Sequence, residues 1–298
     1  MVKIIYSEEY LKHETGWHPE NKARLSACVK FLKKHERFAW VKPLKVDAKD
    51  LECVHSKELV EEIRHRSLER QSTPDNTFNR ETFEIALLAC GGALKAARES
   101  KEEFSFALIR PPGHHAGKKF FGGFCYFNNI AFAVRKIQQE QGIDKAMIVD
   151  FDMHHGNGTQ DIFYKDESVF YLSFHQNPLY TFPGTGHKRE NNTHIQSVPL
   201  DIGMKDSKYV KIFEESFNRH FEDFKPGLVA ISSGFDIFTS DFAVGNKMLI
   251  KKHETFNRIG AAIKGKVSDE TPCFGVLEGG YDLNDLPVNL FQFLKAFA

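Results

Sequence analysis

The chain has 298 residues, and its 40 Lys and Arg balance 40 Asp and Glu, so the formal net charge is zero. This balance excludes a strongly basic footprint, and we expect no direct nucleic-acid binding. Five cysteines without a C-x-x-C pair predict reduced thiols and a cytoplasmic protein. No apolar run reaches the roughly 18 residues of a membrane span, and the first ten residues lack the apolar core of a signal peptide.

Short apolar runs alternate with amphipathic stretches along the chain. The apolar runs predict buried strands at 2–6, 106–110, 146–151, 169–174, 228–233 and 273–278. The amphipathic stretches predict helices at 20–35, 80–100, 129–142, 207–224 and 254–267, with one more at the end of the chain. Residues 69–79 are polar and predict a surface loop. The alternation predicts an α/β fold with a mostly parallel sheet and helices on both faces.

Polar and glycine-rich segments follow five of these strands, at the carboxyl ends where such sheets bind ligands. The richest segment is VDFDMHHGNG, in which Asp150, Asp152 and His154 share one face of an extended chain. Asp152 and His154 can hold one metal ion, and Asp236 follows a further strand as a third donor. Three protein ligands with an open fourth position are typical of catalytic zinc, although two carboxylates and one imidazole also suit Fe²⁺ or Mn²⁺.

The remaining histidines and aromatic residues near these strand ends have two interpretations each. His155 faces away from the metal donors, so we expect it to support the site from behind or to belong to the core. His175 follows another strand and has the same two interpretations. Four others are expected to be solvent-facing or structural: His187, His194, His220 and His253. Phe124 and Phe182 belong either to the ordinary core or to the walls of a narrow apolar channel.

The motifs RPPGHHA, GFCYFNN, DFDMHHGNGTQ, FPGTG, SSGFD and EGGYD occur in an order that resembles the zinc-dependent histone deacetylase superfamily. That superfamily includes bacterial histone deacetylase-like and acetylpolyamine amidohydrolases and the acetoin-utilisation proteins. The resemblance runs from residue 16 to residue 281 and implies one three-layer α/β/α domain of the arginase–deacetylase type, residues 1–298. It implies removal of acetyl or other acyl groups from an acylated lysine side chain or a small acylated amine such as an acetylpolyamine.

The resemblance also implies a role for each matching residue. One zinc ion per chain falls on Asp152, His154 and Asp236. The tandem histidines are His114 and His115, with His115 as general base and then acid, and Tyr281 donates a hydrogen bond to the oxyanion. Asp150 backs His114, and Asn157 backs His115, which places the chain on an asparagine-bearing, class II-like branch. Because an amide stabilises imidazolium less than a carboxylate does, we expect a lower pKa for His115 than in relatives that carry Asp at the position of Asn157.

Two further sites come from the same resemblance. The walls of a substrate channel fall on Gly123, Phe124 and Phe182. A K⁺ or Na⁺ ion falls on oxygens of Asp150, Ser173 and Phe174, together with those of Asp152 and His154.

The chain departs from the superfamily beside the metal donors. Phe242 and Ala243 stand where many relatives have Pro-Leu, so the wall there is expected to differ in shape. Polyamine-selective relatives carry an acidic residue at the cavity mouth, and the candidates here are Glu69, Asp75 and Asp241. Two other functions stay open: an arginase-like enzyme with two manganese ions, and an inactive binding protein on the same fold. No pattern in the sequence indicates an oligomeric state.

Overall fold

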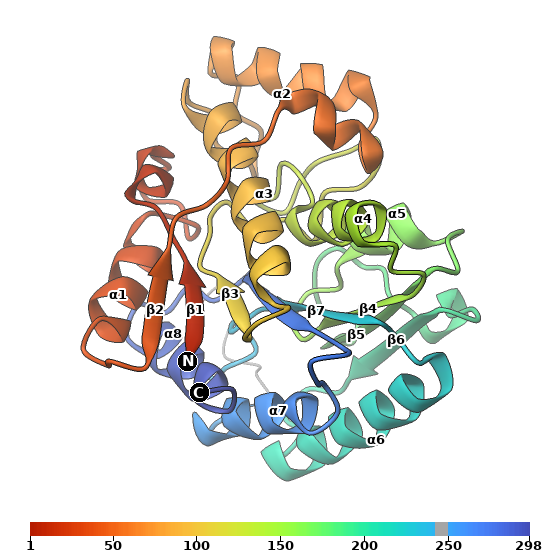
Figure 1. The fold of residues 1–298 in the computed structure, drawn as a ribbon. Coiled ribbons are helices and arrows are strands. Elements are labelled where there is room, and N and C mark those ends of the chain that lie inside the picture. The colour runs from red at the N-terminus through yellow and green to blue at the C-terminus, as the bar shows by residue number, and fades with distance from the viewer. Residues whose placement is uncertain (242–249) are drawn as a thin grey trace.

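The computed structural model describes residues 1–241 and 250–298, and its centre is one eight-stranded sheet (Figure 1). The strands are β1 Val2–Ile5, β2 Phe38–Val41, β3 Ser105–Ala107, β4 Ala146–Asp150, β5 Val169–Gln176, β6 Ile195–Leu200, β7 Leu228–Ser233 and β8 Cys273–Leu277. Their order is β2-β1-β3-β8-β7-β4-β5-β6, and every pairing between them is parallel. All carboxyl ends therefore lie along one edge.

Helices cover both faces of the sheet, which gives the expected three-layer α/β/α arrangement (Figure 1). The helices are α1 Ala23–Leu32, α2 Lys57–Glu69, α3 Thr82–Glu99, α4 Asn129–Gln141, α5 Asn157–Phe163, α6 Asp206–Phe224, α7 Glu254–Lys264 and α8 Asp285–Lys295. Short 3₁₀ turns occupy Glu8–Lys12 (η1), Ala48–Cys53 (η2) and Lys188–Glu190 (η3). Helices α2 to α5 lie on one face, and α1, α6, α7 and α8 lie on the other.

Local signals explain where the helices begin and end. The side chain of Asn128 caps α4 by accepting the N–H of Ala131, and Gly142 ends the helix in the left-handed conformation. Ser56 caps α2 in the same way. Helices α2 and α5 were not predicted. The apolar face of α2 is narrow, with only Leu59, Val60, Ile63 and Ser67 buried, and α5 has only seven residues.

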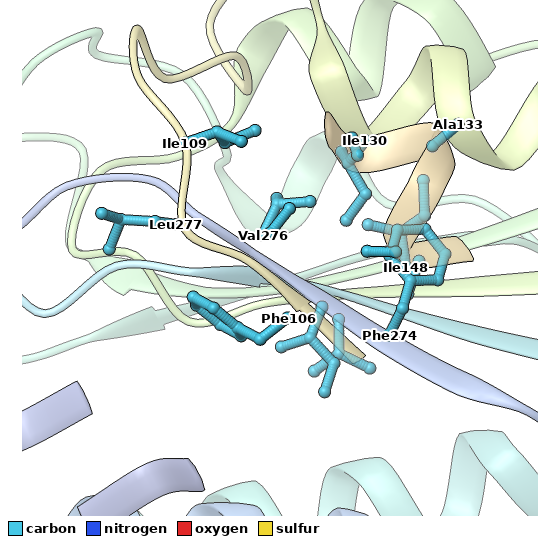
Figure 2. Packing of buried hydrophobic residues seen from close by; sticks show 14 of the residues in the cluster. Phe106, Ile109, Ile130, Ala133, Ile148, Phe274, Val276 and Leu277 are labelled. Atoms are coloured by element: carbon cyan, nitrogen blue, oxygen red, sulfur yellow. The ribbon is translucent and has the colours of Figure 1, made fainter. Parts of the chain in front are cut away.

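The core lies between the central strands and the helices that cover them. Figure 2 shows Ile148 of β4 and Phe274 and Val276 of β8 on the face of the sheet that Ile130 of α4 covers. Phe106 of β3 points to the opposite face, where its ring centroid lies 6.3 Å from that of Phe293 of α8. Each of these side chains is withdrawn from solvent, and burying one such group stabilises a fold by about 1.5–3 kcal/mol. This packing gives the carboxyl edge of the sheet a rigid base.

Other sequence expectations can be compared with the described residues. All five cysteines are free thiols. Among the helices described, none contains a stretch that is both long enough and apolar enough to cross a bilayer. Phe242 and Ala243, whose side chains were expected to reshape a wall of the site, lie outside the described residues.

Candidate active site

Three predicted metal donors meet at the carboxyl edge. Asp152 and His154 follow β4, and Asp236 follows β7, which is the parallel neighbour of β4. One ligand atom from each residue lies within 4.8 Å of the others. His154 Nδ1 is 3.2 Å from Asp152 Oδ1 and 3.0 Å from Asp236 Oδ2. We call these three residues the metal-candidate group.

The metal-candidate group holds two buried carboxylates, and the hydrogen bonds within the fold do not satisfy all of their oxygens. Oδ2 of Asp236 is buried without a hydrogen-bond partner of acceptable geometry, although it lies 3.0 Å from His154 Nδ1. Burial opposes protonation of His154, but the two carboxylates outweigh it and raise its pKa to about 10. A buried carboxylate oxygen without a partner, beside a second carboxylate and an imidazole, fits a divalent cation. The residues present therefore fit the implied zinc ion.

The backbone around these carboxylates approaches closely. Gly279 N–H donates to Asp152 Oδ2 at 2.8 Å, and Met153 N–H donates to Asp236 Oδ1 at 3.1 Å. A Cβ added to Gly279 would collide with both carboxylates, and one added to Gly234 would collide with that of Asp152. Glycine is therefore required at both positions for reasons of space.

The tandem histidines lie on a turn after β3, so their rings are not driven to opposite faces as they would be on a strand. His114 Nδ1 is 3.0 Å from Asp150 Oδ2, and His115 Nδ1 is 2.8 Å from Asn157 Oδ1. The two ring centroids are 4.0 Å apart. Each histidine thus contacts the backing residue that the resemblance implied.

The pKa values of the two histidines are shifted in opposite directions. Burial lowers the pKa of His114, but the negative charges of Asp150 and Asp152 outweigh burial and raise it to about 10. Burial holds the pKa of His115 well below its usual range, and positive charge on His114 and His154 lowers it further. His115 is therefore neutral near pH 7, and the amide of Asn157, which carries no charge, offsets this lowering only in part.

Tyr281 is held by a turn that follows β8. Its N–H donates to Asp241 Oδ2 at 2.5 Å, and Arg24 Nε donates to the carbonyl of Gly280 at 2.6 Å. The guanidinium of Arg24 also lies 4.8 Å from the centre of the Tyr281 ring. Burial raises the pKa of Tyr281 well above its usual range, which keeps the hydroxyl protonated as a hydrogen-bond donor.

A cavity of about 260 Å³ leads to these groups. It is lined by Asp75, His115, Gly123, Phe124, His154, Phe182 and Tyr281. Phe124 has φ of 68°, a left-handed conformation that is costly for a bulky residue, and its ring packs edge-on against His18 at 4.4 Å. Phe182 is half exposed at the rim. Of the two alternatives for these phenylalanines, the structure favours channel walls.

The three acidic candidates for the cavity mouth are separated by the structure. Asp75 lines the cavity, and its Oδ2 accepts the N–H of Gly123 at 2.6 Å. Asp241 is buried beneath the Tyr281 turn, and Glu69 is exposed at the end of α2. Only Asp75 is therefore placed to meet a group at the entrance.

Two other histidines support the site from behind. His155 points to Thr185 and Gln160, with ring nitrogens 2.8 Å and 3.1 Å from their side-chain oxygens. His175 contacts Ser173 Oγ at 2.8 Å and the carbonyl of Gly186 at 2.9 Å. Burial lowers the pKa of both imidazoles, which fits the supporting role considered for them.

Two residues at the site were not predicted. Arg24 belongs to an amphipathic helix, where arginine is ordinarily exposed, yet it is 0% exposed here. Glu278 was part of the EGGYD motif, but nothing in the sequence indicated what its carboxylate contacts. No local sequence pattern indicated a role at the site for either residue.

Comparisons with known proteins agree with this geometry. The family model described as "Histone deacetylase domain" matches residues 18–297, so the chain belongs to the histone deacetylase family. A "Probable deacetylase" of Archaeoglobus fulgidus is 37% identical, with 99% of this chain and 86% of that protein covered. "Histone deacetylase 10, chloroplastic" of Oryza sativa is 32% identical, with 99% and 73% covered. The crystal structure of the HDA15 HD domain matches with a TM-score of 0.91 at 30% identity, with 99% of this chain and 90% of that chain covered.

Proposed function

We propose that this chain is a zinc-dependent deacylase that hydrolyses the amide of an N-acylated amine. The observation that carries this proposal is the metal-candidate group, in which one buried carboxylate oxygen makes no hydrogen bond, next to a cavity that His115 and Tyr281 also line. One zinc ion would be held by Asp152, His154 and Asp236. When bound, zinc supplies Lewis-acid polarisation of the amide carbonyl and lowers the pKa of a water molecule.

The chain's own residues divide the remaining chemistry. Neutral His115 accepts the proton of the attacking water and then returns it to the leaving amine. Protonated His114, paired with Asp150, holds positive charge beside the reacting atoms. Tyr281 donates a hydrogen bond to the developing oxyanion. The opposite pKa directions of the two histidines support this division of roles.

The cavity walls favour a narrow substrate with an alkyl chain. The rings of Phe124 and Phe182 flank the channel, and Gly123 leaves space because a Cβ there would collide with Phe182 and His115. An acylated lysine side chain or a small acylated amine has an uncharged amide and a methylene chain that suit such walls. Cytoplasmic location is part of the proposal, and the five free thiols support it.

A monovalent cation site is a separate part of the proposal. Asp150 pairs with Ser173 across β4 and β5, so the residues named for K⁺ or Na⁺ lie on neighbouring strands. Phe174 follows Ser173 in β5. Such an ion would offset the buried charge of Asp150 and support the base of the site.

The deciding experiment is a substrate panel with zinc analysis. Acetyl-lysine peptides, longer acyl-lysine peptides, acetylputrescine and acetylspermidine are incubated with wild type and Tyr281→Phe. We expect one zinc per chain and a rate loss of about 10²–10³-fold in the variant, because it lacks the oxyanion donor. Full activity in Tyr281→Phe would contradict the assigned role.

The same experiment separates the other candidate functions. Two manganese ions per chain would favour the arginase-like enzyme, although the described residues contain a single group with metal-ligand geometry. Zinc binding without turnover on any member of the panel would favour an inactive binding protein.

A further inference from the structure

Glu278 is a buried carboxylate that the proposed chemistry does not use. It directly follows β8 and is 0% exposed. Its Oε2 accepts the N–H of Gly113 at 2.7 Å and that of His114 at 3.2 Å. Its Oε1 accepts the hydroxyl of Ser232 at 3.0 Å. In the described part of the chain, its side chain therefore bonds to uncharged donors from two other strand ends.

The two amide contacts fix the turn that carries both tandem histidines. Two successive N–H groups that converge on one oxygen form a small anion-binding nest. The nest fixes the main chain at His114, from which one ring reaches Asp150 and the next reaches Asn157. Burial raises the pKa of Glu278 to about 7 despite these donors, so holding a carboxylate here is costly to the fold.

The other end of the same residue is joined to the turn that carries Tyr281. The Glu278 N–H donates to the carbonyl of Ser233, and Arg24 Nη2 donates to the carbonyl of Glu278 at 2.5 Å. The next residue, Gly279, donates to Asp152. The main chain of Glu278 thus belongs to the Tyr281 turn, while its side chain reaches the histidine turn.

We propose that Glu278 is a positioning residue, which holds the tandem-histidine turn in register with the Tyr281 turn by accepting the Gly113 and His114 amides. The inference rests on the proposed deacylase function for its kinetic consequence. Its structural content is the pair of amide hydrogen bonds, which can be tested without turnover.

Two conservative variants of Glu278 separate the effect of side-chain length from that of charge. Glu278→Gln keeps the side-chain length and an acceptor oxygen but loses the charge, whereas Glu278→Asp keeps the charge but is shorter by one methylene. We expect kcat of Glu278→Gln to stay within about tenfold of wild type. We expect kcat of Glu278→Asp to fall by about 10²-fold, because a displacement near 1 Å misaligns reacting groups on this scale. KM should change little in both variants, since Glu278 does not line the cavity.

Ser232→Ala is the matched control, because it removes the third hydrogen bond of Glu278 and leaves both amide contacts in place. Its kcat should resemble that of wild type, and zinc content and melting temperature are measured for every variant. Amide hydrogen exchange supplies a readout that needs no activity: the Gly113 and His114 N–H groups should exchange faster in Glu278→Asp and remain protected in Glu278→Gln.

Two results would overturn the proposal. One is unchanged protection of both amides in Glu278→Asp. The other is an equal loss of kcat in Glu278→Gln and Glu278→Asp, which would make charge the important property. A wild-type protein without turnover on the whole substrate panel would count against the proposed function, whereas the exchange measurement would still decide the role of Glu278.

Discussion

Two groups of buried charged residues contact the Tyr281 turn, and they differ in how fully their charges are paired. In the arginine–glutamate cluster, Glu20 accepts hydrogen bonds from Arg24 at 3.0 Å and from Arg110 at 2.8 and 2.9 Å. The remaining guanidinium donors reach main-chain carbonyls, including those of Tyr10 and Gly280. In the metal-candidate group, by contrast, two carboxylates share the single imidazole of His154, and Oδ2 of Asp236 makes no hydrogen bond of acceptable geometry.

The difference separates a structural cluster from a candidate site for an ion. The two arginines outweigh the burial of Glu20 and lower its pKa to about 2, so its charge is satisfied within the fold. The carboxylates of the metal-candidate group instead raise the pKa of His154 to about 10 and crowd each other. Buried charge is tolerated when it is paired, and a group left incomplete is a candidate for function.

Substituting a carboxylate of the metal-candidate group should give the largest loss of activity. Asp236→Asn should lose bound zinc and fall to background turnover, because one ligand is gone. In the presence of a chelator, however, the variant should be at least as stable as metal-free wild type, since the change relieves the repulsion between two buried carboxylates that share one imidazole. Metal analysis and urea unfolding measure both properties. A large loss of stability in the metal-free variant would mean that Asp236 stabilises the fold without an ion.

The same kind of substitution in the arginine–glutamate cluster should lower the free energy of unfolding instead. Glu20→Gln leaves two buried guanidinium groups without their counter-charge, and breaking such a pair costs about 3–5 kcal/mol. Urea unfolding gives the value. The matched control is Glu9→Gln, which breaks an exposed pair with Lys12 and should change stability by less than about 0.5 kcal/mol. Equal effects of the two changes would refute the importance of the buried cluster.

Acid should weaken the fold through histidines before it reaches Glu20. His55 donates from Nδ1 to the carbonyl of Gly117 and accepts the N–H of Asn128 at Nε2, which requires a neutral ring. Burial lowers the pKa values of His13, His55 and His175 to about 4. Because the unfolded chain binds more protons between about pH 6.5 and 4, stability is fully present above this window and falls within it, by up to about 3 kcal/mol per histidine.

Melting temperatures measured across this range test the prediction. His55→Gln removes one titrating group and should reduce the dependence of unfolding free energy on pH by up to one proton. The contribution of Glu20 should persist until the pH falls below about 4.5, the usual range of a glutamate, towards its folded pKa of about 2. An unaltered pH slope in His55→Gln would assign the acid sensitivity to other groups.

The smallest expected effect concerns the amide behind His115. Asn157→Asp places a carboxylate at the Nδ1 contact and should raise the pKa of His115 by about one unit or more. The protonated ring cannot act as a base, so the acid limb of the kcat/KM profile should move to higher pH. Asp150→Asn, behind His114, gives the complementary measurement, and an acid limb that moves only in that variant would reverse the assigned roles.

Much of the fold was predictable because central strands buried on both faces produce continuous apolar runs. The six predicted strands are confirmed. The two missed strands, β2 and β6, lie at the edges of the sheet, where β2 buries only Phe38 and β6 contains Pro199. Edge strands tolerate both exposure and proline, which removes the pattern that identifies a strand.

The metal-candidate group was predictable because parallel strands bring their carboxyl ends together and alternation places Asp152 and His154 on one face. The contacts that support it were not. Gly113 and Glu278 are separated by 165 residues, and Arg110 and Glu20 by 90. No local pattern of residues encodes such a pairing, so only the folded chain reveals which buried charge meets which partner.

The crowding at Gly234 and Gly279 has a practical consequence for redesign. Because the backbone at both glycines lies against carboxylates of the metal-candidate group, no larger residue fits without moving them. In a mutant library designed to accept new acyl groups, most substitutions at these two glycines would therefore disrupt the site. The half-exposed ring of Phe182 has solvent on one side, so the rim is where a change in selectivity can be sought without disturbing the chemistry beneath it.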